Sequence, residues 1–147
     1  MSDSEHIDIY REARAAKDFS KASGLIPYAK FLGITFSEVD GQLVFKLPFA
    51  EKNIGNTMLP AIHGGVIGGF LENAAVMYLM WVMESTAMPK IIDINIDYIL
   101  SGRPEDTFAV CEIVKQGKRI ANVQIKAWQS DPGKPIAVAR SHFKLIK

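Results

Sequence analysis

The sequence has little of several features that would assign it to particular classes of protein. Its 147 residues contain one cysteine, Cys111, so no disulfide forms within the chain and a reducing, cytoplasmic setting is expected. Seventeen basic and sixteen acidic residues leave a formal net charge of +1, without a basic run that would indicate nucleic acid binding. No Cys/His spacing is typical of a metal site, so no metal is expected. The N-terminal 21 residues carry early acids and no apolar core, which argues against a signal peptide.

The remaining composition is that of an ordinary globular protein, with 48% hydrophobic and 22% charged residues. A chain of this length can bury a sizeable core without a metal or a disulfide. We expect one domain over residues 1–147, with residues 1–23 as an N-terminal helical extension.

The N-terminal third changes its hydrophobic period from helical to alternating. Residues 4–22 predict an amphipathic helix with Ile9, Ala13 and Ala16 on its apolar face. Residues 34–49 alternate, and Asp40-Gly41 between them predicts a hairpin. Residues 50–62, rich in Asn, Gly and Pro, are expected to form a loop.

The segment "HGGVIGGFLENAAVMYLMWVM", residues 63–83, is the most apolar in the chain. Residues 66–83 approach the length of a membrane span, but Glu72 and Asn73 at the centre and several glycines argue against one. We predict a central buried helix over residues 64–84, ended by residues 85–89.

The last third predicts strands only. Residues 91–100 place Ile92, Ile94, Ile96 and Tyr98 on one face, residues 106–131 form a hairpin turning near 116–118, and residues 135–146 close the sheet. The order of helix, two strands, long helix and four strands indicates an α+β fold, with a curved antiparallel sheet wrapped on the central helix.

Glu72 is the first candidate for chemistry, because a carboxylate in an apolar segment is expensive without a partner or a shifted pKa. It is either a reactive group or a helix glutamate that reaches solvent or an interfacial arginine. Gly64 and Gly65 start the helix, where free N–H groups and the helix dipole favour an oxyanion. Gly68 and Gly69 are interpreted as positions of close packing.

Several segments together resemble the hotdog-fold thioesterases, in particular the acyl-CoA thioesterases of the phenylacetate-pathway type. The segments are "IPYAKFLGITFSEVDGQLVFKLP", "HGGVIGGFLENAA" with its acid nine positions after the histidine, "DINIDYI" and "KQGKRIANVQIKAWQSD". The resemblance implies a hotdog fold, a homodimer joined sheet edge to edge, and often a tetramer. It also implies an acyl-CoA substrate, with no cofactor besides the coenzyme A of the substrate.

The resemblance also implies roles for particular residues. Glu72 of one subunit would face His63 and Gly65 of the other, with Glu72 as base or nucleophile and the Gly65 amide as oxyanion donor. The family often has aspartate at the place of Glu72, so the reach to the carbonyl differs by one methylene. His63 would fix the loop or bind the thioester end of the substrate.

The family often carries an asparagine six residues before this histidine. That place is Thr57 here, flanked by Asn53 and Asn56, so Asn56 is either a group that orients the substrate or a plain turn residue. The candidates for substrate binding are Gly64, Asn73, Arg103, Lys118 and Arg119, with Lys115 as a further cation.

One departure from the family leaves other functions open. Relatives commonly have a serine or threonine near the start of the strand after the helix, where this chain has Ile91 and Ile92, with Asp93 or Asn95 as possible substitutes. The alternatives to a thioesterase are a hotdog hydratase or dehydratase of acyl thioesters and a non-catalytic acyl-CoA-binding protein.

Overall fold

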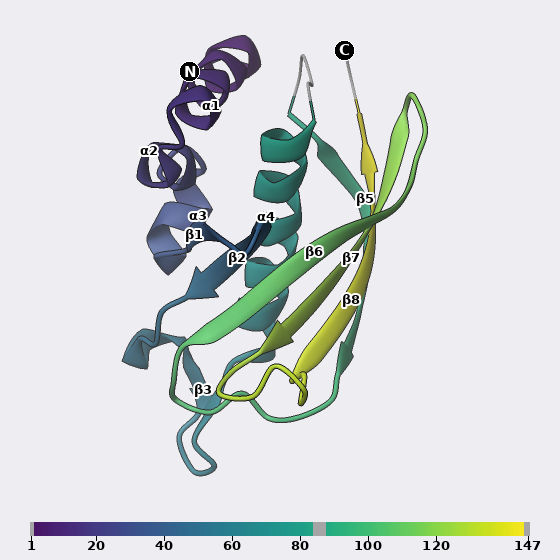
Figure 1. The fold of residues 1–147 in the computed structure, drawn as a ribbon. Coiled ribbons are helices and arrows are strands. Elements are labelled where there is room, and N and C mark those ends of the chain that lie inside the picture. Colours follow the sequence, from purple (N-terminus) through teal and green to yellow (C-terminus); the bar gives the residue numbers. More distant parts are fainter. Residues whose placement is uncertain (1, 84–87, 146–147) are drawn as a thin grey trace.

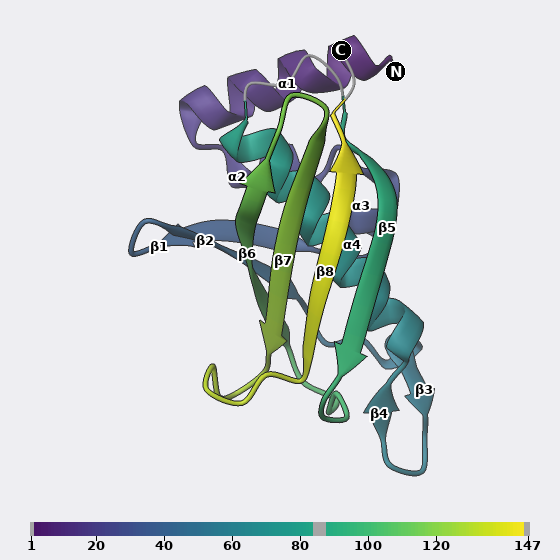
Figure 2. The same ribbon diagram turned by 90° about the vertical axis from the view of Figure 1, so that its right-hand side faces the viewer.

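A curved six-stranded sheet holds one long helix against its inner face (Figures 1 and 2). The computed structural model describes residues 2–83 and 88–145. Its strands follow the order β1-β2-β6-β7-β8-β5, and all neighbours are antiparallel. They comprise β1 (Thr35–Val39), β2 (Gln42–Leu47), β5 (Lys90–Tyr98), β6 (Thr107–Gln116), β7 (Ile120–Trp128) and β8 (Ala137–Lys144). The predicted α+β class is confirmed, and the arrangement is the hotdog fold.

The central helix α4 (Gly64–Val82) is the core of the protein. By length and composition alone it could cross a membrane, but 56% of its 18-residue apolar window is buried inside the protein. Burial against the sheet explains an apolar pattern on nearly all sides of the helix. The predicted end at Glu84 lies outside the described residues; the helix itself ends at Val82.

The N-terminal region contains three helices, and the single helix predicted over residues 4–22 is divided between the first two. They are α1 (Asp3–Ala16), α2 (Phe19–Ser23) and α3 (Pro27–Leu32). The single-helix prediction is wrong because Lys17 adopts a left-handed conformation with φ 52°. The side chain of Asp18 then accepts a hydrogen bond from the Lys21 amide and starts α2. The buried face of α1 is also shifted from the predicted one, and consists of Ile7, Tyr10 and Ala13.

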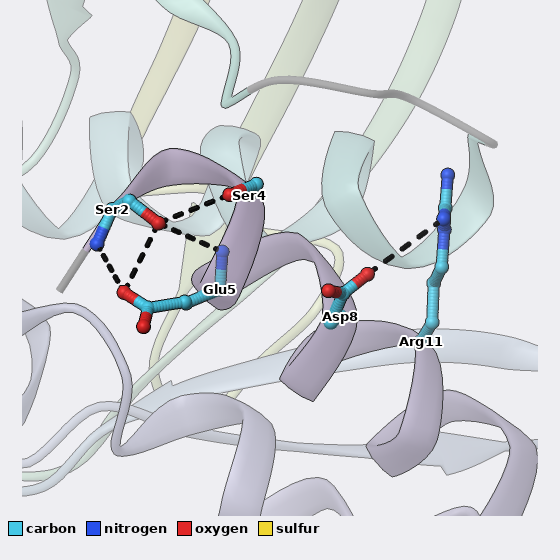
Figure 3. Close-up of polar contacts among 5 residues, drawn as sticks. All are labelled: Ser2, Ser4, Glu5, Asp8 and Arg11. Carbon is cyan, nitrogen blue, oxygen red and sulfur yellow. Dashed lines mark hydrogen bonds and ion pairs between the residues drawn. The ribbon is translucent and has the colours of Figure 1, made fainter.

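Both ends of α1 are fixed by side chains. Figure 3 shows Ser2 and Glu5 exchanging hydrogen bonds, in which the Ser2 amide donates to the Glu5 carboxylate and the Glu5 amide donates to the Ser2 hydroxyl. The Ser2 amide and the Ser2 hydroxyl both donate to the Glu5 carboxylate, and these two bonds lower the pKa of Glu5 below its ordinary value. One turn further, Asp8 and Arg11 lie 3.9 Å apart. Near the other end, the Arg14 guanidinium donates to the backbone carbonyls of Trp81 and Met83. Arg14 thus satisfies carbonyls that the end of α4 leaves without helical partners.

An aromatic cluster closes the fold over the C-terminal half of α4. The Trp81 ring stacks on Phe19 at a centroid distance of 4.8 Å and meets Phe36 edge-on at 5.2 Å. Tyr10 and Phe45 complete the cluster. Aromatic pairs in these geometries add stability beyond the area they bury, so α1, α2 and β1 are held against α4.

The predicted hairpin at Asp40-Gly41 is confirmed, since both residues adopt positive φ angles, 51° and 79°. The predicted loop over residues 50–62 is partly wrong. It contains a 3-10 turn, η1 (Glu51–Asn53), and a small hairpin of β3 (Ile54–Asn56) and β4 (Ala61–Ile62). This hairpin projects beside the start of α4 (Figure 2).

Candidate active site

His63 is the N-cap of α4 and is held from two sides. Its amide donates to the Asn53 carbonyl at 2.8 Å, which ties the residue to the turn before β3. Its ring nitrogen Nδ1 accepts a hydrogen bond from the Gly65 amide at 2.9 Å. An accepting Nδ1 carries no proton, so this hydrogen bond assigns the neutral ring with its proton on Nε2.

The Gly65 amide, the predicted oxyanion donor, is therefore engaged by the chain's own imidazole in this structure. The Gly64 amide, one position earlier, donates to no residue within the described ranges 2–83 and 88–145. Among the described residues, the start of α4 thus offers the N–H group of Gly64, which has no acceptor, and that of Gly65, whose acceptor is the rotatable side chain of His63.

Glu72 lies seven residues beyond Gly65 on α4, about 10 Å along the helix axis. At 3.6 residues per turn, Gly65, Glu72 and Val76 face within about 40° of one another. Glu72 is half-buried, and among the described residues its carboxylate has no hydrogen bond or ion pair. This face of α4 is not covered by the sheet, and we call it the open stripe of α4, defined by Gly65, Glu72 and Val76.

The open stripe lies between two neighbouring elements that pack against glycines of α4. On one side is the strand β5, whose Ile96 would lie 3.1 Å from a Cβ placed on Gly68. On the other is α3, whose Tyr28 would lie 3.0 Å from a Cβ placed on Gly69. Both distances are tighter than ordinary contacts, which agrees with the interpretation of Gly68 and Gly69 as positions of close packing.

The two asparagines among the predicted site residues serve the backbone in this structure. The Asn56 side-chain oxygen accepts from the amides of Met58 and Leu59, at 2.9 and 3.1 Å, and so shapes the tip of the β3–β4 hairpin. Asn73 is buried, and its side chain donates to the Gly69 carbonyl at 2.7 Å within α4. The exposed Asn56 remains within the hairpin beside His63, whereas Asn73 faces the protein interior.

The predicted cations fall at opposite ends of the sheet. The carbonyl of Gly102, next to Arg103, accepts from the Ile62 amide at 2.8 Å, so Arg103 lies near the start of α4. Arg103 and Lys134 line a cleft of about 550 Å³ there, beside Leu59 of the β3–β4 hairpin. Lys118 and Arg119 lie in the β6–β7 turn at the far end of the strands (Figure 2), and Lys115 lies near that end of β6.

Asp93 and Asn95 do not replace the missing hydroxyl near the start of β5, so that expectation is wrong. Both side chains lie on the outer face of the sheet, away from α4, where Asp93 contacts His142 at 2.7 Å and Asn95 is paired with Arg140. Successive side chains of a strand point to opposite faces, so Asp93 and Asn95 share the outer face. Between Ile91 and Asp93 the register shifts, and Ile92 is an extra residue that has no partner on β8. The inner face of β5 consists of Ile91, Ile94, Ile96 and Tyr98. The hydroxyl group on this face is therefore that of Tyr98, at the end of the strand rather than near its start.

Tyr98 is the residue of this region that the sequence interpretation missed as a site residue. Its hydroxyl donates to the Gly64 carbonyl at 2.7 Å, and its ring covers Gly64. The alternation in residues 91–100 already placed Tyr98 on the inner face, but nothing in the sequence indicates that this ring reaches the start of α4.

Comparison with known proteins assigns this arrangement to a family. The thioesterase superfamily profile matches residues 59–136, just over half of the chain. The chain belongs to the thioesterase superfamily. The matched region contains His63, Gly65 and Glu72, and the reaction class that follows from membership is thioester hydrolysis. The predicted resemblance to hotdog-fold thioesterases is thereby confirmed.

Three known proteins are similar to this thioesterase-superfamily chain in sequence or in structure. A Chromobacterium violaceum protein of known structure is 46% identical, with a TM-score of 0.78 over 94% of this chain and 96% of its own. A Bacillus halodurans protein, solved with CoA, shares the fold with 22% identity and a TM-score of 0.76 over 97% and 92% of the two chains. Human acyl-coenzyme A thioesterase 13 is 23% identical over 134 residues, which cover 90% of this chain and 89% of that protein.

Proposed function

We propose that this protein is an acyl-CoA thioesterase that hydrolyses a thioester to a free acid and coenzyme A. The observation that carries the proposal is Glu72, a half-buried carboxylate without a partner among the described residues, on the same stripe as the glycine start of α4. A group that is kept partly desolvated and unpaired is a candidate for chemistry rather than for stability. The human thioesterase and the CoA-bound relative support acyl-CoA as the substrate class.

The thioester carbonyl oxygen binds at the N-terminus of α4 in this proposal. The unpaired Gly64 amide and the Gly65 amide lie where the helix dipole favours developing negative charge. To use the Gly65 amide, the carbonyl oxygen displaces or shares the place of His63 Nδ1. His63 then orients the thioester through the proton on Nε2, and the nearby Asn56 amide group is a second orienting donor.

Glu72 acts on the acyl carbon in one of two ways. As a general base it removes a proton from water while the water oxygen attacks the carbon, and the C–S bond then breaks to release the thiolate. As a nucleophile it attacks the carbon itself, expels the thiolate and leaves an anhydride that water hydrolyses. Both routes release one free acid and one coenzyme A for each water consumed.

A homodimer completes the proposed site. Strand β5 pairs with β8 on one side and forms an edge of the sheet on the other, and Ile91, Ile92 and Tyr98 are exposed along it. An exposed apolar edge strand is a ready template for pairing with another strand. Pairing two copies through β5 places the open stripe of each α4 next to the subunit boundary, and two such dimers form the proposed tetramer.

The coenzyme end of the substrate is assigned to the cations and to the start of α4. Arg103 lies at the His63 end of the protomer and is the candidate for the phosphate groups of its own site. Lys118 and Arg119 lie at the opposite end, so they reach the same coenzyme only across the subunit boundary.

The test is thiol release from a panel of acyl-CoA substrates by the wild type, Glu72→Gln and Glu72→Ala. Loss of a catalytic carboxylate is expected to lower kcat by at least about 100-fold. Glu112→Gln on the exposed face of β6 is the matched control and should retain full activity. Equal activity in wild type and both Glu72 variants would exclude Glu72 from the reaction.

The assay also separates the proposal from a non-catalytic alternative. Absence of thiol release from every acyl-CoA and carrier-protein thioester, with tight acyl-CoA binding in calorimetry, would show a binding protein instead. Hydration of an enoyl thioester without thiol release would show the hydratase alternative.

A further inference from the structure

The peptide bond between Gly64 and Gly65 is held at both of its polar atoms. Its carbonyl oxygen accepts from the Tyr98 hydroxyl at 2.7 Å, and its N–H donates to His63 Nδ1 at 2.9 Å. Since a peptide unit is planar, the carbonyl and the N–H rotate together. A hydrogen bond that fixes the Gly64 carbonyl therefore also fixes the direction in which the Gly65 N–H points.

A contact from outside the helix helps to fix the orientation of this peptide, because glycine flanks it on both sides. Glycine has the widest range of backbone conformations, and the first helical turn lacks some of the hydrogen bonds that hold later turns. The ring of Tyr98 supplies further contact: a Cβ on Gly64 would lie 3.6 Å from the ring, and one on Gly68 would lie 3.4 Å from the hydroxyl. The small residues at positions 64 and 68 thus make room for the ring that steadies them.

The support comes from a different element than the helix it acts on. Tyr98 is the last residue of β5, the edge strand of the sheet, 34 positions after Gly64 in the chain. A hydrogen bond to the carbonyl also polarises the peptide and strengthens its N–H as a donor. The hydrogen bond from Tyr98 can persist while a substrate carbonyl displaces His63 from the Gly65 amide.

We propose that Tyr98 is a positioning residue for the reaction, which orients the Gly64–Gly65 peptide so that the Gly65 amide stabilises the thioester oxyanion. The inference rests on the proposed thioesterase function. Tyr98 contacts neither the acyl carbon nor the water in this mechanism; it acts through the peptide that the oxyanion meets. Removal of its hydroxyl should therefore affect the transition state more than the binding of the substrate.

The test is Tyr98→Phe, which removes the hydroxyl and keeps the ring over Gly64. One neutral hydrogen bond corresponds to about a 3- to 10-fold change in rate, so we expect kcat to fall by that factor with KM unchanged. In ¹⁵N–¹H spectra, the Gly65 amide resonance should shift in the variant, because its peptide has lost the bond to the carbonyl.

Tyr28→Phe is the matched control. Tyr28 also places its ring over a glycine of α4, Gly69, but its hydroxyl makes no hydrogen bond to any described residue. Its kcat and the Gly65 resonance should equal those of the wild type. Both variants should unfold at nearly the same temperature as the wild type, which separates positioning from general stability.

The outcomes distinguish this inference from the proposed function. An active wild type whose kcat and Gly65 resonance are unchanged in Tyr98→Phe overturns the role of Tyr98 and leaves the thioesterase intact. A similar loss of kcat in Tyr28→Phe overturns it as well, because the effect then lacks specificity. A wild type that releases no thiol overturns the proposed function, and with it any catalytic role of Tyr98, even if the resonance shifts.

Discussion

At the scale of single residues, Gly55 controls how closely the β3–β4 hairpin approaches the candidate site. A Cβ at this position would lie 2.8 Å from the Cα, Cβ and Cδ2 atoms of His63. Real Cβ atoms do not approach other atoms so closely, and one of these three atoms belongs to the backbone, so the chain itself would have to move. The glycine therefore allows β3 to lie against His63.

We expect Gly55→Ala to lower the free energy of unfolding by about 1–3 kcal/mol, because the added methyl group overpacks this contact. Urea unfolding followed by circular dichroism measures the change. Gly117→Ala in the β6–β7 turn is the matched control, since the nearest atom to its Cβ would be 3.8 Å away. A variant at Gly55 as stable as the one at Gly117 would contradict the close approach.

At the scale of elements, one carboxylate adds two contacts beside the pairing of β2 with β6. Asp106 precedes β6; one of its oxygens accepts from the Phe49 amide at 2.8 Å, and the other lies 3.5 Å from Lys46 Nζ on β2. The hydrogen bond from Phe49 and, to a lesser extent, the charge of Lys46 lower the pKa of Asp106 below its ordinary value. The ionised form is thus favoured in the folded protein.

A group with a lowered pKa stabilises the fold above its unfolded-state pKa and loses this contribution as the pH falls through its folded-state pKa. Asp106→Asn should therefore be less stable than the wild type at pH 7, and the difference should vanish in acid below the folded-state pKa. The side chain of Asp106 is 42% exposed, so the difference at pH 7 is expected to be only about 0.2–1 kcal/mol.

Unfolding curves of wild type and Asp106→Asn at a series of pH values from 7 down to about 2 check this expectation. Glu112→Gln, which removes an exposed carboxylate from the outer face of the sheet, is the control and should show no comparable convergence. A difference between Asp106→Asn and wild type that persists unchanged in acid would contradict the argument.

At the scale of the whole molecule, the edge of the sheet predicts assembly. The edge strand β5 exposes apolar side chains, so this chain of 16.3 kDa should occur in solution at twice that mass or more. Ile92 is the extra residue in the register of β5 and is 52% exposed. Ile92→Lys should shift the equilibrium towards the single chain in light scattering after gel filtration.

Val114→Lys is a close control for this change. Val114 lies at the register shift of β6 and is 51% exposed, but β7 and β8 separate its strand from β5. The mass of this variant should equal that of the wild type. A wild type that elutes as a single chain, or equal effects of the two substitutions, would contradict assembly through β5.

Secondary structure could be predicted from the sequence where the hydrophobic residues follow a strict period or a continuous run. Contacts between segments that are distant in the sequence could not be predicted. The alternation around Asp40-Gly41 and the continuous apolar run of residues 64–82 specify their elements because local conformation and burial agree. The break at Lys17 was missed because lysine rarely adopts positive φ, and only the cap at Asp18 reveals it. The bond from Tyr98 to Gly64 joins residues 34 positions apart, so it depends on how the strand packs on the helix.

Cys111 on the inner face of the sheet has a practical consequence for experiments. Its thiol is almost fully buried, and burial raises its pKa, so the reactive thiolate is nearly absent in the folded protein. A chromogenic disulfide reagent that reports free coenzyme A should therefore be consumed by released product and not by the enzyme. Over hours in the absence of substrate, the same reagent would label Cys111 only when the protein opens locally or unfolds. The rate of labelling at this one cysteine would then report the rate of that opening.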